Sequence, residues 1–186
     1  MLIIDMQNAF IEEASPLCIK GARITIPNCV RALDAARRKG IPVIYIKRQY
    51  REDGSDVEIT RRELWERGGK PLTPGSTGPL GEEYPAELKP EAGDYEIIKP
   101  RWSAFFETEL DILLRRLEVG TVILTGTTTP NCIRTTCYDA NALNYNVVII
   151  EDCTSSVTTE IQKANIEDMA RMGAIITTVE EFASCR

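Results

Sequence analysis

The sequence predicts an α/β protein in three layers, with helices on both faces of a mostly parallel six-stranded sheet. Short apolar runs, typical of buried strands, alternate along most of the chain with longer segments whose apolar residues recur at helical spacing. Strands that alternate with helices are joined by right-handed crossovers, which produce a parallel sheet. A chain of 186 residues also suits about one domain, so we expect residues 1–186 to fold as a single unit.

The predicted strands are short apolar or alternating runs that end at a polar residue or a turn. They cover Met1–Asp5, Pro42–Lys47, Tyr95–Lys99, Thr121–Thr125, Asn146–Glu151 and Ala174–Thr177. The predicted helices are amphipathic, and a glycine follows two of them, as is common at the end of a helix. They cover Pro27–Lys39, Thr108–Glu118, Pro130–Leu143 and Thr159–Met172.

The segment from Gln49 to Pro90 interrupts this alternation. It is rich in proline, glycine and charged residues, and loops of this length are usually functional or mobile. Trp65 lies in it beside Leu64, so part of the segment should fold onto an apolar surface. We expect a homodimer or homotetramer in which this segment covers the active site of a neighbouring subunit.

The chain contains no histidine, which excludes both Ser–His–Asp and Cys–His catalysis. Zinc sites with histidine ligands are excluded too, and the cysteines are not spaced in the pairs that a four-thiolate zinc site needs. We therefore expect free thiols, no metal and no other cofactor. Any catalytic base must be a carboxylate, a lysine or a tyrosine.

The formal net charge is −6, which argues against a nucleic-acid partner because phosphate binding needs a basic surface. Apolar runs such as Val147–Ile150 are far too short to cross a membrane. We expect a cytoplasmic protein whose partner is a small molecule.

Three polar side chains should lie at the carboxyl ends of strands, where parallel α/β sheets place their working residues. Asp5 ends the first predicted strand, Lys99 ends the third, and Cys132 follows the fourth. Taken singly, the cysteine would be a small buried hydrophobe, the aspartate a loop cap and the lysine a solvated side chain. Together they could carry out acyl transfer without histidine.

The residues before Cys132 favour a reactive thiol. Thr129 suits the N-cap and Pro130 the first position of the helix that follows, which would place Cys132 in the first turn. Free N–H groups and the helix dipole favour a thiolate there. The strand-to-helix turn that begins at Gly126 could in addition hold an oxyanion with its N–H groups.

Three ordered motifs resemble those of the isochorismatase-like cysteine hydrolase superfamily. The family patterns are D-x-Q-N-x-F, K-x-x-x-S-x-F and G-x-x-T-x-x-C. Their counterparts here are Asp5-Met-Gln-Asn-Ala-Phe10, Lys99-Pro-Arg-Trp-Ser-Ala-Phe105 and Gly126-Thr-Thr-Thr-Pro-Asn-Cys132. The resemblance extends over essentially the whole chain and implies an isochorismatase-like hydrolase fold, which is Rossmann-like.

The resemblance also implies roles for these residues. Cys132 would be the nucleophile, Asp5 the general base and acid, and Lys99 their electrostatic partner. A cis peptide bond is implied between Thr127 and Thr128, and the N–H groups of Thr128 and Cys132 would form the oxyanion hole.

Departures from the family narrow the expected chemistry. Nicotinamidases hold a metal through an aspartate and histidines, and true isochorismatases generally lack the cysteine. The sequence thus resembles the metal-free amidohydrolases of N-carbamoylsarcosine, ureidoacrylate and biuret. We expect hydrolysis of a small C–N bond through a thioester. A redox-reactive thiol protein and an inactive ligand-binding protein of the same fold are the alternatives.

Four further residues are candidates for binding the substrate. Arg101 follows Lys99 closely, and its planar guanidinium suits a substrate carboxylate. Its alternative is a surface arginine. Phe10, Trp102 and Ile133 are candidates for the pocket wall, with plain core packing as their alternative.

Overall fold

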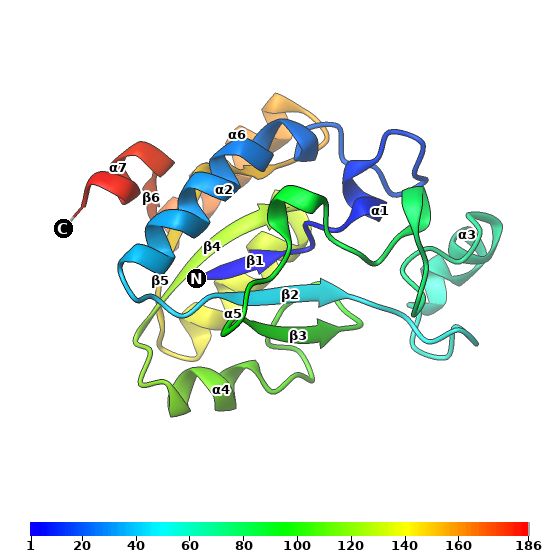
Figure 1. Ribbon diagram of the computed structural model, residues 1–186, viewed down its shortest axis with the longest axis horizontal. Helices are drawn as coiled ribbons and strands as arrows, with labels where there is room; N and C mark the ends of the chain where they lie inside the picture. Colours follow the sequence, from blue (N-terminus) through cyan, green and yellow to red (C-terminus); the bar gives the residue numbers. More distant parts are fainter. Residues whose placement is uncertain (186) are drawn as a thin grey trace.

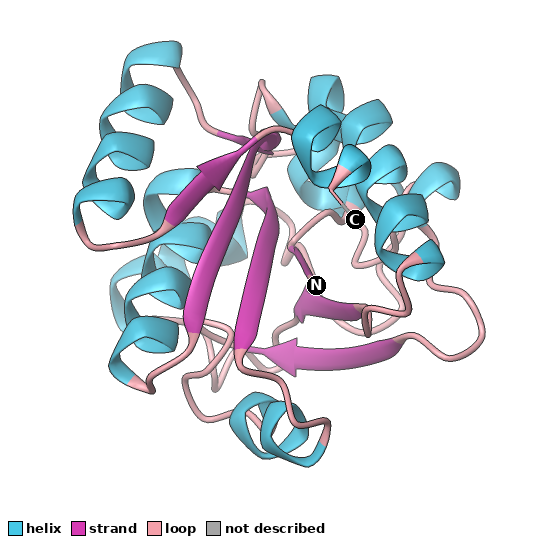
Figure 2. Ribbon diagram, turned by 90° about the vertical axis from the view of Figure 1, so that its left-hand side faces the viewer, coloured by secondary structure: helices cyan, strands magenta, loops and turns pink. Residues whose placement is uncertain are grey.

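The computed structural model describes residues 1–185 and contains one six-stranded, wholly parallel sheet with helices on both faces (Figures 1 and 2). The predicted fold class is confirmed. All six predicted strands are present, as β1 (Leu2–Ile4), β2 (Ile44–Arg48), β3 (Tyr95–Lys99), β4 (Thr121–Thr127), β5 (Asn146–Ser155) and β6 (Ile175–Thr177).

The order of the strands in the sheet is β3-β2-β1-β4-β5-β6. From β1 the chain adds β2 and β3 on one side, then returns to add β4, β5 and β6 on the other. The boundary between β1 and β4 is therefore the topological switch point, where open parallel sheets bind their ligands. There Ile4 pairs with Gly126, so the residues that follow these two strands emerge next to each other.

The helices form two layers, each of which buries one face of the sheet. On one face, α2 (Ala22–Arg38) and α7 (Val179–Ser184) cover a core that contains Ile3 and Tyr45. On the other, α4 (Leu110–Arg116), α5 (Arg134–Ala142) and α6 (Thr159–Arg171) cover a core that contains Leu2 and Ile4. Neighbouring residues of β1 thus face opposite layers, as the period of a strand requires. No helix within residues 1–185 is long and apolar enough to span a bilayer.

The prediction that the first long helix begins at Pro27 is wrong, because α2 begins at Ala22 and contains this proline. Proline removes one helical hydrogen bond and crowds the preceding turn. However, Ala22, Thr25 and Ile26 are buried, and their burial offsets this cost. Three short helices were not predicted, α1 (Asn8–Ile11), α3 (Arg62–Arg67) and α7. The capping box of Thr178 and Glu181, which begins α7, is a sequence signal that could have revealed that helix.

The segment 49–90 folds onto its own chain. It contains α3 (Arg62–Arg67) and the short 3₁₀ turns Ile59–Arg61, Gly78–Leu80 and Ala86–Leu88. Trp65 is buried, contacts Tyr50 edge-on and donates a hydrogen bond of 2.9 Å to the carbonyl of Pro71. Its apolar surface therefore needs no neighbouring subunit, and the homo-oligomer stays a prediction that rests on the family resemblance.

Candidate active site

Asp5, Lys99 and Cys132 come together in one buried cluster. The ammonium of Lys99 donates to Asp5 Oδ2 at 2.8 Å, to the carbonyl of Arg101 at 3.0 Å and to Cys132 Sγ at 3.6 Å. Asp5 and Lys99 are fully buried, and Cys132 is nearly so. Lysine has three N–H donors, so this geometry uses all of them and fixes the ammonium between the carboxylate and the sulfur.

An unusual backbone at the end of β1 and β4 brings these groups together. Asp5 has a φ of +53°, a conformation that aspartate tolerates better than most residues, and its N–H donates to the carbonyl of Ile46 at 2.9 Å. Gly126 has a φ of +109°, and a Cβ there would lie only 2.1 Å from the carbonyl oxygen of Ile4. Only glycine therefore lets β4 approach β1 this closely before it turns toward Cys132.

The three threonines after Gly126 hold the turn through their hydroxyl groups. The peptide bond between Thr127 and Thr128 is cis, in accordance with the resemblance. The Ser155 hydroxyl lies 2.9 Å from Thr127 Oγ1, and the Thr129 hydroxyl donates to the carbonyl of Ser155 at 2.9 Å. The prediction that Thr129 caps the next helix is thus wrong, because its side chain binds β5. The chain continues as a π turn, Thr129–Ile133, which leads into α5.

The environment of Cys132 keeps its thiol protonated. Burial raises the pKa of Cys132 to about 11, and the negative charge of Asp5 acts in the same direction. The charges of Lys99 and Arg48 oppose this effect without overcoming it. The expectation that the helix start favours a thiolate is therefore wrong, because burial outweighs it. The Cys132 thiol would therefore have to lose its proton to a base before its sulfur could act as a nucleophile.

Asp5 offers an acceptor for that proton. Its Oδ1 atom is buried and has no hydrogen-bond partner within residues 1–185, whereas Oδ2 accepts from Lys99. A buried carboxylate oxygen without a partner is costly and commonly marks a functional site. The cluster therefore contains a thiol and a carboxylate that are joined by one ammonium group.

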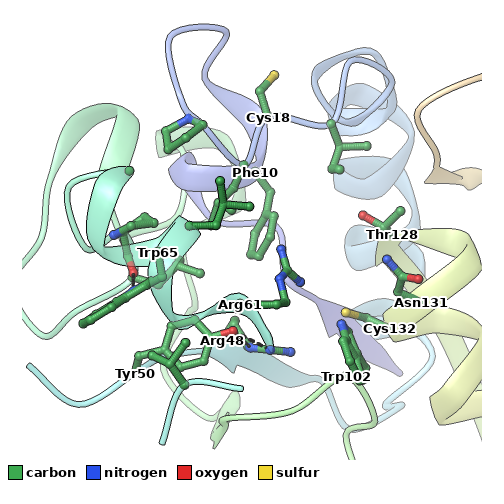
Figure 3. A pocket seen from close by; sticks show the side chains of 18 residues that line it. Phe10, Cys18, Arg48, Tyr50, Arg61, Trp65, Trp102, Thr128, Asn131 and Cys132 are labelled. Carbon is green, nitrogen blue, oxygen red and sulfur yellow. Dashed lines mark hydrogen bonds between the residues drawn. The ribbon is translucent and has the colours of Figure 1, made fainter. Parts of the chain in front are cut away.

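A cavity of about 240 Å³ lies above the cluster, and its wall includes Cys132 and Thr128 from the turn after β4 (Figure 3). Phe10 and Trp102 line it, as the sequence predicts. Ile133 does not line it, because its side chain is fully buried in the core between the sheet and α5. The cavity wall is mostly apolar and is completed by residues of the segment 49–90, among them Tyr50 and Trp65.

Arg101 does not contribute its side chain to the cavity wall. Its guanidinium donates to the backbone carbonyls of Asp56 and Pro100, the latter at 2.9 Å. Arg101 thus ties the segment 49–90 to the end of β3. Its other contribution is its carbonyl, which accepts a hydrogen bond from Lys99.

Two other arginines, Arg48 and Arg61, line the cavity and were not predicted. Arg48 ends β2, so the rule that identified Asp5 and Lys99 would have found it. It is buried, forms an ion pair with Glu58 and donates to the Tyr50 hydroxyl. Burial acts to raise the pKa of Glu58, but the charge of Arg48 and the hydrogen bonds that the carboxylate accepts, among them those from Tyr50 and Arg48, together lower it. Arg61 lies in a turn of the segment 49–90, where no pattern in the sequence marks it.

The described residues include no group of side chains that could ligate a metal ion. Within residues 1–185 no three of the Cys, Asp or Glu side chains lie close enough together to hold an ion. The groups beside the cavity with a formal charge are instead the guanidinium groups of Arg48 and Arg61. These residues do not fit the metal that the resemblance associates with nicotinamidases.

The fold and the cluster define a parallel α/β protein with a buried cysteine, lysine and aspartate at its switch point. The family profile of the isochorismatase domain matches residues 1–181. The chain belongs to the isochorismatase family.

Relatives of the chain carry different names. A probable inactive nicotinamidase of Arabidopsis thaliana is 41% identical over 185 residues, which cover 98% of this chain and 93% of that protein. The ureidoacrylate amidohydrolase RutB of Yersinia enterocolitica is 34% identical over 206 residues, which cover 100% of this chain and 87% of that protein. A crystal structure of an isochorismatase family protein from Desulfovibrio vulgaris superposes with a TM-score of 0.92 at 41% identity, covering 97% of this chain and 93% of that one.

Proposed function

We propose that this protein is a cysteine amidohydrolase that cleaves the C–N bond of a small amide, carbamoyl or ureido compound. The observation that carries the proposal is the position of the Lys99 ammonium, between a carboxylate with one unpartnered oxygen and the sulfur of Cys132. The similarity to a ureidoacrylate amidohydrolase supports the same class of reaction.

In the proposed reaction, Asp5 accepts the thiol proton while Cys132 Sγ forms a bond to the carbonyl carbon of the substrate. The N–H groups of Thr128 and Cys132 donate to the resulting oxyanion. Asp5 then returns its proton to the leaving nitrogen, the C–N bond breaks, and a thioester remains. A water molecule then gives a proton to Asp5 and attacks the thioester, the C–S bond breaks and the acid is released, and Asp5 returns its proton to the sulfur to restore the thiol. Lys99 retains its proton and offsets the negative charge throughout.

A catalytically inactive, ligand-binding protein is the second candidate function, favoured by the name of the Arabidopsis relative. The two candidates are separated by a panel of primary amides and ureido compounds scored by ammonia release. Turnover that is present in the natural protein and absent from Cys132→Ala supports the amidohydrolase. Binding without turnover across the panel would favour the inactive protein. A redox-reactive thiol is disfavoured, because such thiols have lowered pKa values and solvent access.

Alkylation of Cys132 by iodoacetamide is expected to accelerate continuously from neutral pH to about pH 9.5. The thiolate is the reactive form, and below a pKa of about 11 its fraction increases roughly tenfold for each pH unit. Peptide mapping by mass spectrometry measures the rate at this position, and the exposed Cys185 provides a comparison. A rate at Cys132 that is already constant near neutral pH would show a resting thiolate and contradict this assignment.

Turnover is expected to be insensitive to chelators. The proposed chemistry uses a thiol, a carboxylate and an ammonium, and no step requires a Lewis acid. Treatment with a strong chelator, followed by elemental analysis, should leave the rate of ammonia release unchanged. A loss of activity that one particular divalent metal restores would overturn the proposed mechanism.

A further inference from the structure

The charge of the cavity wall points to the chemistry of the substrate. Of the described residues that line the cavity, those with a formally charged side chain are Arg48 and Arg61, and no carboxylate is among them. Beneath them, Asp5 and Lys99 form an ion pair whose charges cancel. The cavity therefore has an excess of positive charge, although the whole chain carries a formal charge of −6.

The positive charge of Arg48 is already compensated. Its Nη2 atom donates to Glu58, and its Nε and Nη2 atoms lie 3.1 and 2.5 Å from the Tyr50 hydroxyl. The Tyr50 hydroxyl in turn donates to Glu58 Oε2 at 2.9 Å. This buried network makes Arg48 a fixed part of the wall. It leaves Arg61 as the uncompensated cation.

Arg61 differs from the arginines that follow it. Arg62 pairs with Glu66 and Arg67 pairs with Glu63 on the outside of α3. The guanidinium of Arg61, in contrast, has no hydrogen bond or ion pair with any of residues 1–185, and Figure 3 shows it projecting into the cavity. A half-buried cation in an apolar cavity gains most from an anionic ligand, since no acidic neighbour competes for it.

The backbone at Arg61 is linked to the end of β2. Arg61 is the last residue of the 3₁₀ turn Ile59–Arg61, and its N–H donates to the carbonyl of Glu58 at 2.8 Å. Glu58 is held by Arg48 at the end of β2. Arg61 is thus linked through Glu58 to the end of β2, at the same edge of the sheet as the cluster.

We propose that Arg61 selects the substrate by binding its carboxylate, so that this site hydrolyses small monoanionic acids. The carboxylate lies against the Arg61 guanidinium, the scissile carbonyl lies at Cys132, and the apolar wall formed by Phe10 and Trp102 contacts the part between them. The single uncompensated charge accounts for one carboxylate. This inference rests on the proposed amidohydrolase function and specifies the substrate class of that site.

The test compares N-carbamoyl amino acids of increasing length with their methyl esters, in which a neutral ester group replaces the carboxylate. The natural protein should release ammonia from the acids with a kcat/KM about 10 to 100 times that for the esters. Arg61→Gln should raise KM for the acids by about the same factor, with kcat little changed and the esters unaffected. Arg61→Lys should recover part of the loss, because it retains the charge without the planar donors.

Arg67→Gln is the matched control, since Arg67 is exposed on α3, the helix that follows Arg61, and pairs with Glu63. It should leave KM unchanged for both acids and esters. Esters cleaved as well as acids by the natural protein, or an unchanged KM for acids in Arg61→Gln, would overturn the role of Arg61.

A binding measurement keeps this inference separate from the proposed function. Calorimetric titration of Cys132→Ala with the same acids requires no turnover, and adding Arg61→Gln should weaken binding by about 10 to 100 times. Carboxylate binding that depends on Arg61, together with no turnover in the natural protein, would contradict the proposed amidohydrolase function and support the anion site at Arg61. Turnover of acids with no dependence on Arg61 in either assay would support the amidohydrolase function and contradict the anion site at Arg61.

Discussion

Replacement of Cys132 by alanine is expected to reduce ammonia release by at least about a thousandfold, the largest effect of any single substitution in this chain. Without the sulfur no thioester forms, and Asp5 has no thiol proton to accept. The protein should remain folded, because alanine removes one atom from a side chain that lies at the edge of the core, beside the cavity. Initial rates on the best substrate of the panel measure the loss.

Cys185→Ala is the matched control for this experiment, because Cys185 is exposed and lies near the end of the chain. It should retain the full rate. Covalent trapping gives an independent readout, since a brief acid quench during turnover should leave a mass increase on the peptide that contains Cys132. If Cys132→Ala retained more than about a thousandth of the rate after subtraction of background hydrolysis, covalent catalysis would be wrong.

Asp5 and Lys99 are expected to act as one catalytic unit. Asp5→Asn cannot accept the thiol proton, and Lys99→Met leaves the negative charge that develops at the cluster without compensation. Each should lower the single-turnover rate of thioester formation by about a hundredfold or more. Because both block the same step, the double variant should be little slower than either single one. Losses that multiply fully would show that the two residues act independently.

The stability of the same variants should follow a different pattern. Asp5 and Lys99 form an ion pair that is completely buried, and removal of one partner leaves a buried charge, which costs about 3–5 kcal/mol of unfolding free energy. The double variant removes both charges and should recover much of this loss, although it remains inactive. Urea unfolding monitored by circular dichroism measures the effect. The exposed pair of Arg67 and Glu63 provides a control, since its removal should cost no more than about 1 kcal/mol.

Stability that recovers without activity would separate the catalytic role of this pair from its structural role. A double variant as unstable as the single ones would show that the two charges do not compensate each other in the folded protein. In that case the loss of activity would follow from damage to the structure, and the prediction that Asp5 and Lys99 act together in catalysis would be contradicted.

The fold and the cluster of Asp5, Lys99 and Cys132 could be predicted from local patterns in the sequence. Strands such as Thr121–Thr127 are buried on both faces of a parallel sheet. Such strands contain a continuous apolar run, which can be recognised in the sequence. The topology then places the carboxyl ends of β1 and β4 at one edge. Asp5 and Cys132 could therefore be associated across more than a hundred residues of intervening sequence.

Properties that depend on contacts between distant segments were decided by the tertiary structure. The prediction of a reactive thiolate rested on the local helix start, but the pKa of Cys132 depends on how deeply the whole fold buries it. Likewise, the sequence showed no partner for Trp65, and its contact with Tyr50 arises only when the segment 49–90 folds onto itself.

The position of Arg61 in the cavity wall was likewise decided by the tertiary structure. Arg101 is close to Lys99 in sequence, yet its side chain turns away to the backbone of Asp56. Arg61 is far from Asp5, Lys99 and Cys132 in sequence, yet it reaches the cavity wall. The periodicity of a strand or helix places side chains on a face of their own element. It carries no information about which loop side chain fills a space between elements, because that depends on the packing of the complete chain.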